Sequence, residues 1–67
     1  MSSEFTARDK ADCAQREVTQ RVRVYKRLVE AGRMSERTAM REIDTMQSIA
    51  DDYERIASEE EKKGRLL

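Results

Sequence analysis

The segment Ala31-Gly32-Arg33-Met34-Ser35 interrupts the only apolar periodicity in the chain, so it determines the path that the backbone takes. Gly32 suits the left-handed conformation that follows a helix end, where a Cβ would clash. Ser35 suits the N-cap of a following helix, because its hydroxyl can accept a hydrogen bond from an early amide. A connection this short makes the two helices antiparallel neighbours. The sequence therefore predicts an all-α fold, a helical hairpin that turns at residues 32–35.

An apolar stripe with helical spacing lies on each side of this segment. Steps of three and four residues keep each stripe on one side of an α-helix. The first stripe consists of Ala11, Ala14, Val18, Val22, Tyr25 and Val29, and the second of Ala39, Ile43, Met46, Ala50, Tyr53 and Ala57. We predict helices over residues 6–31 and 36–62, packed against each other through these stripes.

The outer ends of both helices carry capping signals. Thr6 is the expected N-cap of the first helix, with Asp9 placed to favour the positive end of its dipole. Gly64 is the expected end of the second helix. We therefore expect a disordered lead over residues 1–5 and a tail over residues 63–67.

Charged residues beside the stripes predict how the two helices align. A fold about the turn sets Tyr25 opposite Ile43 and places Gln15 near Tyr53. Opposite charges that repeatedly face each other at the edges of a helix pair indicate its register. The expected pairs are Lys26 with Glu42, Arg8 with Glu60, Lys10 with Glu61, and Arg21 with Asp44 or Asp51.

The composition indicates a thin core. Charged residues make up 42% of the 67 residues and aromatic residues only 4%. A single cysteine excludes an internal disulfide, and the absence of histidine argues against zinc. Intrinsic disorder is the competing interpretation, but a net charge of zero and periodic apolar residues argue against it. Small chains without disulfides or metals usually gain burial by self-association.

Several apolar residues fall beside the stripes rather than within them. They are Val24, Leu28, Ala31, Ile49 and Ile56. A lone hairpin leaves these side chains partly in water, whereas two hairpins can bury them in a four-helix bundle. We predict a homodimer whose interface contains Val24, Leu28, Ile49 and Ile56. The alternative is that scattered exposed aliphatic residues are ordinary on protein surfaces.

Basic and acidic residues are divided unevenly between the predicted helices. Residues 16–41 contain eight basic and three acidic side chains, whereas residues 42–61 contain eight acidic and one basic. One explanation is that opposite charges on the two helices favour the correct register. The other is nucleic-acid binding, because outward-facing arginines suit phosphate. The candidate contacts are Arg16, Arg23, Arg27, Arg33 and Arg37.

Nucleic-acid binding is the less favoured of these two explanations. A nucleic-acid-binding domain normally carries a strongly positive net charge. Here the net charge is zero, and the acidic second helix would repel phosphate. The chain also lacks the aromatic residues of a base-stacking platform.

The sequence contains no constellation that points to catalysis, and its many carboxylates are explained by a solvated acidic face. Without histidine there is no imidazole base or ligand, and no glycine-rich loop is present to hold phosphate. Cys13 is expected to be a small, semi-buried structural residue. We expect no enzymatic activity, metal, cofactor or small-molecule substrate. The chain has neither a signal peptide nor a stretch long and apolar enough to span a membrane, so we expect a cytoplasmic protein.

Positions 11–57 resemble small helical proteins encoded in bacteriophages and prophages, most of them of unassigned function. The resemblance rests on Arg16-Glu17, Val24-Tyr25, Val29, Ala31-Gly32-Arg33-Met34, Ala39, Glu42-Ile43, Met46, Ile49 and Tyr53. The Gly-Arg-Met turn and the Val-Tyr pair are its most distinctive parts. Lys26 stands where such relatives often carry proline, which leaves the first helix uninterrupted. The resemblance implies a phage or bacterial cytoplasmic setting and supplies no catalytic or binding residues.

Together these observations predict a non-enzymatic, prophage-type protein that acts through protein–protein contact as a homodimer. The alternative is a small nucleic-acid-associated protein that uses the basic face of the first helix.

Overall fold

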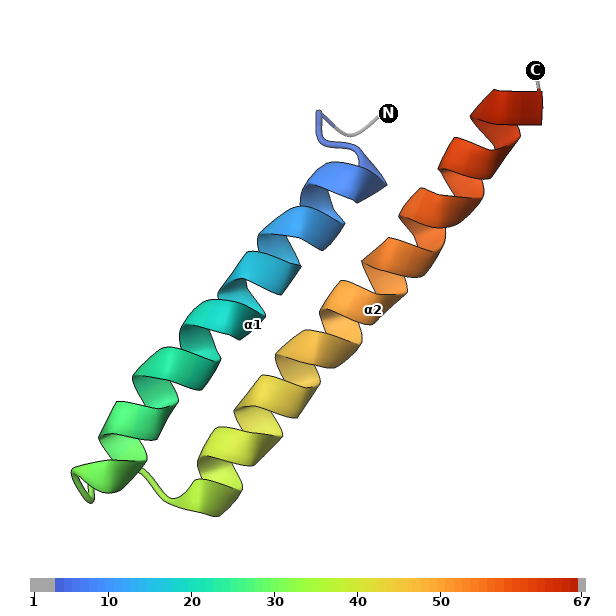
Figure 1. Cartoon of the computed structure of the whole chain (residues 1–67). Coiled ribbons are helices and arrows are strands. Elements are labelled where there is room, and N and C mark those ends of the chain that lie inside the picture. The colour runs from blue at the N-terminus through green and yellow to red at the C-terminus, as the bar shows by residue number, and fades with distance from the viewer. Residues whose placement is uncertain (1–3, 67) are drawn as a thin grey trace.

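The computed structural model describes residues 4–66, and these residues form two helices packed side by side in opposite directions (Figure 1). Helix α1 spans Ala7–Glu30 and helix α2 spans Glu36–Leu66. The molecule is a rod with extents of 53 × 19 × 17 Å. The predicted all-helical hairpin is therefore confirmed. Below, the turn end is the end that contains Gly32, and the open end is the opposite one.

The first helix starts with a reciprocal cap. The Asp9 amide donates to Thr6 Oγ1 at 3.0 Å, and the Thr6 amide donates to Asp9 Oδ2 at 3.1 Å. Thr6 was predicted as this N-cap, and its extended backbone makes Ala7 the first helical residue. The predicted lead falls partly on residues 1–3, outside the described residues, and Glu4 and Phe5 form a bend.

The turn forms as the sequence predicted. Gly32 has a φ of +73°, and its amide donates to the Val29 carbonyl oxygen at 3.0 Å. The Arg33 amide donates to the Leu28 carbonyl oxygen at 2.9 Å, which completes a Schellman motif. Ser35 then caps α2, since its Oγ accepts the Thr38 amide at 3.1 Å.

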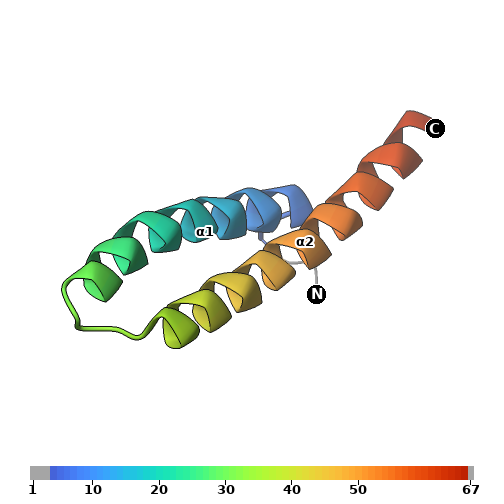
Figure 2. The same ribbon diagram turned by 60° about the horizontal axis from the view of Figure 1, so that its bottom comes forward.

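The predicted end of the second helix is wrong. Helix α2 continues through Gly64 to Leu66, so residues 63–66 are helical, and Leu67 lies outside the described residues. Glycine ends a helix when it adopts the left-handed conformation, and in the described residues only Gly32 has a positive φ. Within a helix, glycine costs about 1 kcal/mol relative to alanine, which is too little to stop it. The end of α2 projects beyond the start of α1 (Figure 2).

Small residues form the interface between the helices. Its buried residues are Ala7, Ala11, Ala14, Val18, Ala39, Ala50 and Ala57. Tyr25, Ile43, Met46 and Tyr53 are only partly buried. No described side chain larger than valine is buried, so the core is as thin as the composition indicates.

One member of the first predicted stripe is placed wrongly. Val22 is 49% exposed, and Arg21 is the more buried of the two. From Ala7 onward the interface follows alternate steps of four and three residues, the 3.5-residue repeat of a coiled coil, and this repeat reaches position 21 after Val18. The prediction placed two consecutive steps of four before Tyr25, which rotated position 22 into the interface.

The predicted charge pairs across the helices differ from the observed ones. Arg21 donates to the Glu17 carboxylate at 3.0 Å and to the Glu42 carbonyl oxygen at 3.1 Å, rather than to Asp44 or Asp51. Arg8 pairs with Glu54 and Glu61 instead of Glu60. Lys10 lies over the Tyr53 ring instead of reaching Glu61, and Gln47 donates to Gln15, which was expected near Tyr53.

These differences share one cause. The expected pairs assumed a symmetric fold about the turn, whereas the Schellman motif and the Ser35 cap fix where each helix leaves it. The observed partners on α2 lie up to about two turns from the expected positions. Long arginine and lysine side chains can follow such a shift, so their charges did not define the register closely.

Candidate functional site

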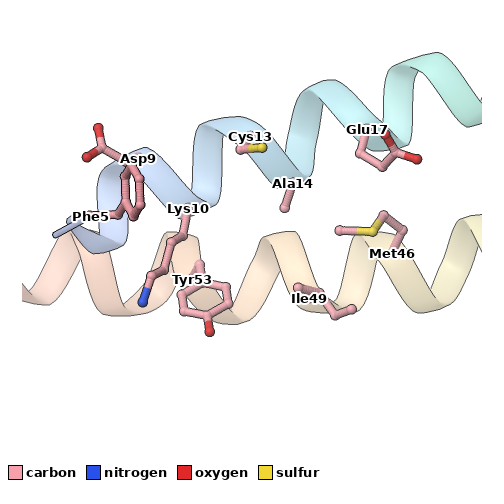
Figure 3. Close-up of a pocket in the computed structure, with 9 residues that line it drawn as sticks. All are labelled: Phe5, Asp9, Lys10, Cys13, Ala14, Glu17, Met46, Ile49 and Tyr53. Carbon is pink, nitrogen blue, oxygen red and sulfur yellow. The ribbon is translucent and has the colours of Figure 1, made fainter. Parts of the chain in front are cut away.

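An apolar groove runs along one side of the hairpin, towards the open end (Figure 3). Both helices contribute to it, and its surface is almost entirely carbon and sulfur. Its lining residues are Phe5, Asp9, Lys10, Cys13, Ala14, Glu17, Met46, Ile49 and Tyr53. Phe5 is 60% exposed and Ile49 41% exposed, so large apolar side chains face solvent here.

Lys10 links the two walls of this groove. Its Nζ lies 5.5 Å from the centroid of the Tyr53 ring, so it reaches from α1 across to α2 (Figure 3). This cation–π contact keeps the ammonium at the rim while the stem covers apolar surface. Phe5 and Lys10 were not predicted from the sequence as groove residues. The available signal was a large apolar residue directly before the N-cap Thr6, a position that often packs against the helix it precedes.

The predicted interface residues continue the groove in both directions. Val24 follows Glu17 by seven residues, and Leu28 comes one turn later, so both lie on the groove side of α1. Ile56 follows Ile49 by seven residues on α2 and is 37% exposed. We call this surface the apolar face. It consists of Phe5, Cys13, Val24, Leu28, Met46, Ile49, Tyr53 and Ile56.

The large exposed apolar residues are concentrated on this face. Residues 4–64 include six such side chains, and Phe5, Val24, Ile49 and Ile56 belong to the apolar face. The other two, Val22 and Met40, line a second groove at the turn end, on the opposite side of the hairpin. That groove is bordered by charged residues, which are Lys26, Glu30, Glu36 and Arg37. Four of the six large exposed apolar side chains thus lie on the apolar face.

The five arginines proposed for nucleic-acid contact are all exposed, but they do not converge on one site. Arg16 and Arg23 line a shallow polar surface on α1 alone, which also contains Asp12. Arg33 lies in the turn, and Arg37 lies on α2 at the edge of the second groove. The ion pairs recorded in the described part of the chain involve other arginines, namely Arg8, Arg21 and Arg55.

Two arginines are held firmly by carboxylates. Arg8 donates from Nε and Nη2 to both oxygens of Glu61, at 3.1 and 2.9 Å, and also donates to Glu54. These hydrogen bonds raise the pKa of Arg8, the bond to Glu61 contributing most. The hydrogen bond to Glu17 likewise raises the pKa of Arg21. A pKa that is raised in the folded state stabilises the fold at every pH below the unfolded-state pKa, and this stabilisation is lost only in strong alkali. Both guanidinium groups stay charged at working pH.

The described residues offer no constellation for catalysis or metal binding. Residues 4–64 contain no group of three or more histidine, cysteine, aspartate or glutamate side chains placed to hold a metal ion. Cys13 is exposed, so the expected semi-buried position is wrong. The reason is that Ala14, its neighbour, occupies the interface, and Cys13 therefore points towards the groove side of α1 (Figure 3).

Comparison with known proteins assigns no family to this chain. No protein-family model matches it, and neither a curated protein nor a solved structure is significantly similar to it. Within residues 4–66, neither helix contains an apolar stretch of the length that a bilayer crossing requires. The apolar face is therefore the strongest indication of function that the molecule offers.

Proposed function

We propose that this chain is a non-enzymatic helical module that acts through protein–protein contact and forms a homodimer through its apolar face. The observation that carries the proposal is the gathering of Phe5, Val24, Ile49 and Ile56 on one side of the hairpin. Two such faces packed together would form a four-helix bundle.

The thin interface between α1 and α2 supports this proposal. Its buried residues are alanines and one valine, which remove little apolar surface from water. The apolar face carries larger side chains that a single hairpin leaves exposed. Covering them with a second copy would add the burial that a chain of 67 residues otherwise lacks.

Sedimentation equilibrium tests the dimer. The wild-type protein is expected to sediment above its monomer mass of 7.8 kDa at tens of micromolar. Ile49→Glu places a charge at the centre of the apolar face and should shift the protein towards monomer. Burying one unpaired carboxylate costs several kcal/mol, so we expect the dimer dissociation constant to rise by at least about 100-fold.

Met40→Glu is the matched control, because Met40 is 66% exposed and lies on the opposite side of the hairpin. It adds the same charge to the same helix and should leave the dimer intact. A helical wild-type protein that stays monomeric throughout this range would contradict the proposal, as would equal dissociation of both variants.

Nucleic-acid association is the second candidate function. The observation in its favour is that Arg16, Arg23, Arg27, Arg33 and Arg37 are exposed and that the recorded ion pairs involve other arginines. An electrophoretic mobility shift with DNA and RNA at low salt tests it. If the function is real, binding weakens steeply as salt rises and is lost in the double variant Arg23→Glu, Arg27→Glu. Absence of any shift at low salt would rule it out.

The bacteriophage or prophage setting and the cytoplasmic location remain predictions from the resemblance and the composition. They are compatible with either function. Recovery of the chain together with phage or prophage proteins from an infected or lysogenic cell would support them.

A further inference from the structure

We propose that the capping box at the start of α1 is a positioning device for the homodimer, since it holds Phe5 in the groove, where a second copy covers this side chain. Thr6 is then a positioning residue that acts on the dimer through Phe5. The inference rests on the proposed homodimer and adds how the start of α1 takes part in it.

Phe5 is the most exposed of the large apolar side chains on the apolar face. It is 60% exposed, compared with 41% for Ile49 and 40% for Val24. A ring this exposed is the part of the face that gains most from being covered. Phe5 nevertheless precedes α1, and a residue outside a helix loses conformational entropy when an interface holds it in one place. Ordering that is already present in the free molecule lowers this cost of association, so the contribution of Phe5 depends on what restrains it beforehand.

Two hydrogen bonds restrain the chain next to Phe5. The Thr6 amide, which directly follows Phe5, donates to Asp9 Oδ2 at 3.1 Å, and Thr6 Oγ1 accepts the Asp9 amide at 3.0 Å. Such a reciprocal cap sets the backbone conformation at the N-cap and with it the direction in which the preceding residue enters the helix. Asp9 also lines the groove, so the cap and Phe5 lie at the same end of it (Figure 3).

Lys10 extends this arrangement across the groove. Phe5 directly precedes the N-cap and Lys10 is the fourth helical residue, and side chains at these two positions often pack together at a helix start. The stem of a lysine is apolar enough for such a contact. Lys10 Nζ in turn lies 5.5 Å from the centroid of the Tyr53 ring. Phe5, Lys10 and Tyr53 thus form one row, which leads from the residue before the cap to α2 (Figure 3).

The two N-caps of the hairpin provide a matched comparison. Thr6 does not line the groove, and it borders a separate surface with Arg8, Ala57, Glu60 and Glu61. A substitution of Thr6 therefore alters the cap and leaves the side chains of the groove unchanged. Ser35 caps α2 in the same way, because its Oγ accepts the Thr38 amide at 3.1 Å, but it lies at the turn end. Loss of either cap is expected to lower helix stability to a similar extent.

Fluorine NMR tests where Phe5 lies. Phe5 is the only phenylalanine in the chain, so incorporation of 4-fluorophenylalanine gives a single resonance that reports on this side chain alone. The chemical shift should change on dilution over the range in which sedimentation shows the dimer to dissociate. At each concentration Thr6→Ala should move the resonance towards its position in the unfolded protein, whereas Ser35→Ala should leave it in place. A resonance that stays unchanged while the dimer dissociates would overturn the inference.

Dimer dissociation constants provide an independent test. Phe5→Ala should raise the constant roughly tenfold, because both copies lose an aromatic contact. Thr6→Ala should raise it about fivefold, whereas Thr6→Ser should stay within about twofold of wild type, since serine also caps a helix well. Ser35→Ala should likewise stay within about twofold, because it weakens a cap that does not hold Phe5. The double variant Phe5→Ala, Thr6→Ala should be no weaker than Phe5→Ala alone, since the cap acts through Phe5.

The outcomes separate this inference from the function on which it rests. Equal weakening by Thr6→Ala and Ser35→Ala would mean that helix stability alone affects the dimer, and the inference would fail while the homodimer stands. The same holds if Thr6→Ala has no effect, or if it weakens the dimer further when Phe5 is already alanine. If the wild-type protein is helical but monomeric by sedimentation, the homodimer itself fails.

Discussion

Gly32 has a φ of +73°, and no neighbouring atom lies within 4 Å of the position that a Cβ would occupy. An added methyl group would therefore meet no steric obstacle from the rest of the molecule. The cost of any other residue here comes from the left-handed backbone itself, about 1–2 kcal/mol. Gly64 also has open space around it, but its backbone continues α2.

The two glycines give a matched pair of substitutions. Gly32→Ala should destabilise the protein by about 1 kcal/mol, because alanine disfavours a positive φ. Gly64→Ala should cause no loss and a gain of up to about 1 kcal/mol, because alanine favours a helix. Urea unfolding followed by far-UV circular dichroism measures both. Equal effects of the two substitutions would contradict the observed end of α2.

At the level of the helix, the repeat of 3.5 residues determines which side chains are buried. Val18 is 5% exposed, whereas Val22, one turn later, is 49% exposed. Arg21 takes the position between them and hydrogen-bonds to Glu17 and Glu42. A polar residue at one interface position of a helix pair favours a single register, usually at some cost in stability. Because Arg21 rather than Val22 lies in the interface, this position contributes to the register of α1 against α2.

Removing the same two methyl groups at both valines tests this placement. Val18→Ala should cost about 2 kcal/mol, through lost burial and a small cavity. Val22→Ala should change stability by less than about 0.5 kcal/mol, since its side chain is half exposed and alanine favours the helix. Thermal and urea unfolding of the two variants would measure the difference. A larger loss at Val22 would restore the predicted stripe.

At the scale of the whole molecule, a long rod with a core of small side chains has little surface buried per residue. The hairpin extends 53 Å in one direction and less than 20 Å in the other two. Its two helices share a single interface, and the end of α2 projects beyond it (Figure 2). The stability of such a chain is expected to depend on what covers its apolar face.

The proposed dimer therefore makes stability depend on concentration. The midpoint of thermal unfolding should rise by several degrees as the protein concentration is raised from roughly 5 to 500 µM, because mass action favours the associated, folded state. Ile49→Glu should abolish this dependence, and Met40→Glu should preserve it. The unfolding of all three proteins is followed by circular dichroism at 222 nm, in cuvettes whose path length is adjusted to each protein concentration. A midpoint that stays constant in the wild-type protein would argue for a self-sufficient monomer.

Part of the candidate site could be predicted from the sequence. The sequence was sufficient to identify four of its residues, Val24, Leu28, Ile49 and Ile56. Apolar residues that exceed the interface stripe can be recognised from helical spacing alone, without knowledge of what they contact. Phe5 was assigned to a disordered lead, since an isolated aromatic residue outside a periodic segment carries no pattern. The groove that contains it required the position of Met46 and Tyr53 on the other helix.

The order of residues was sufficient for the local features: the caps at Thr6 and Ser35, the turn at Gly32 and the helical character of both segments. Each of these depends on hydrogen bonds and backbone angles within a few positions, so neighbouring residue types specify them. Which residues face one another across the helices depended on packing in three dimensions. Small differences in helix rotation moved Arg21 inward and Val22 outward and gave Arg8 its partners Glu54 and Glu61. Flexible charged side chains permit several such alignments, and only the close fit of the buried alanines selects one of them.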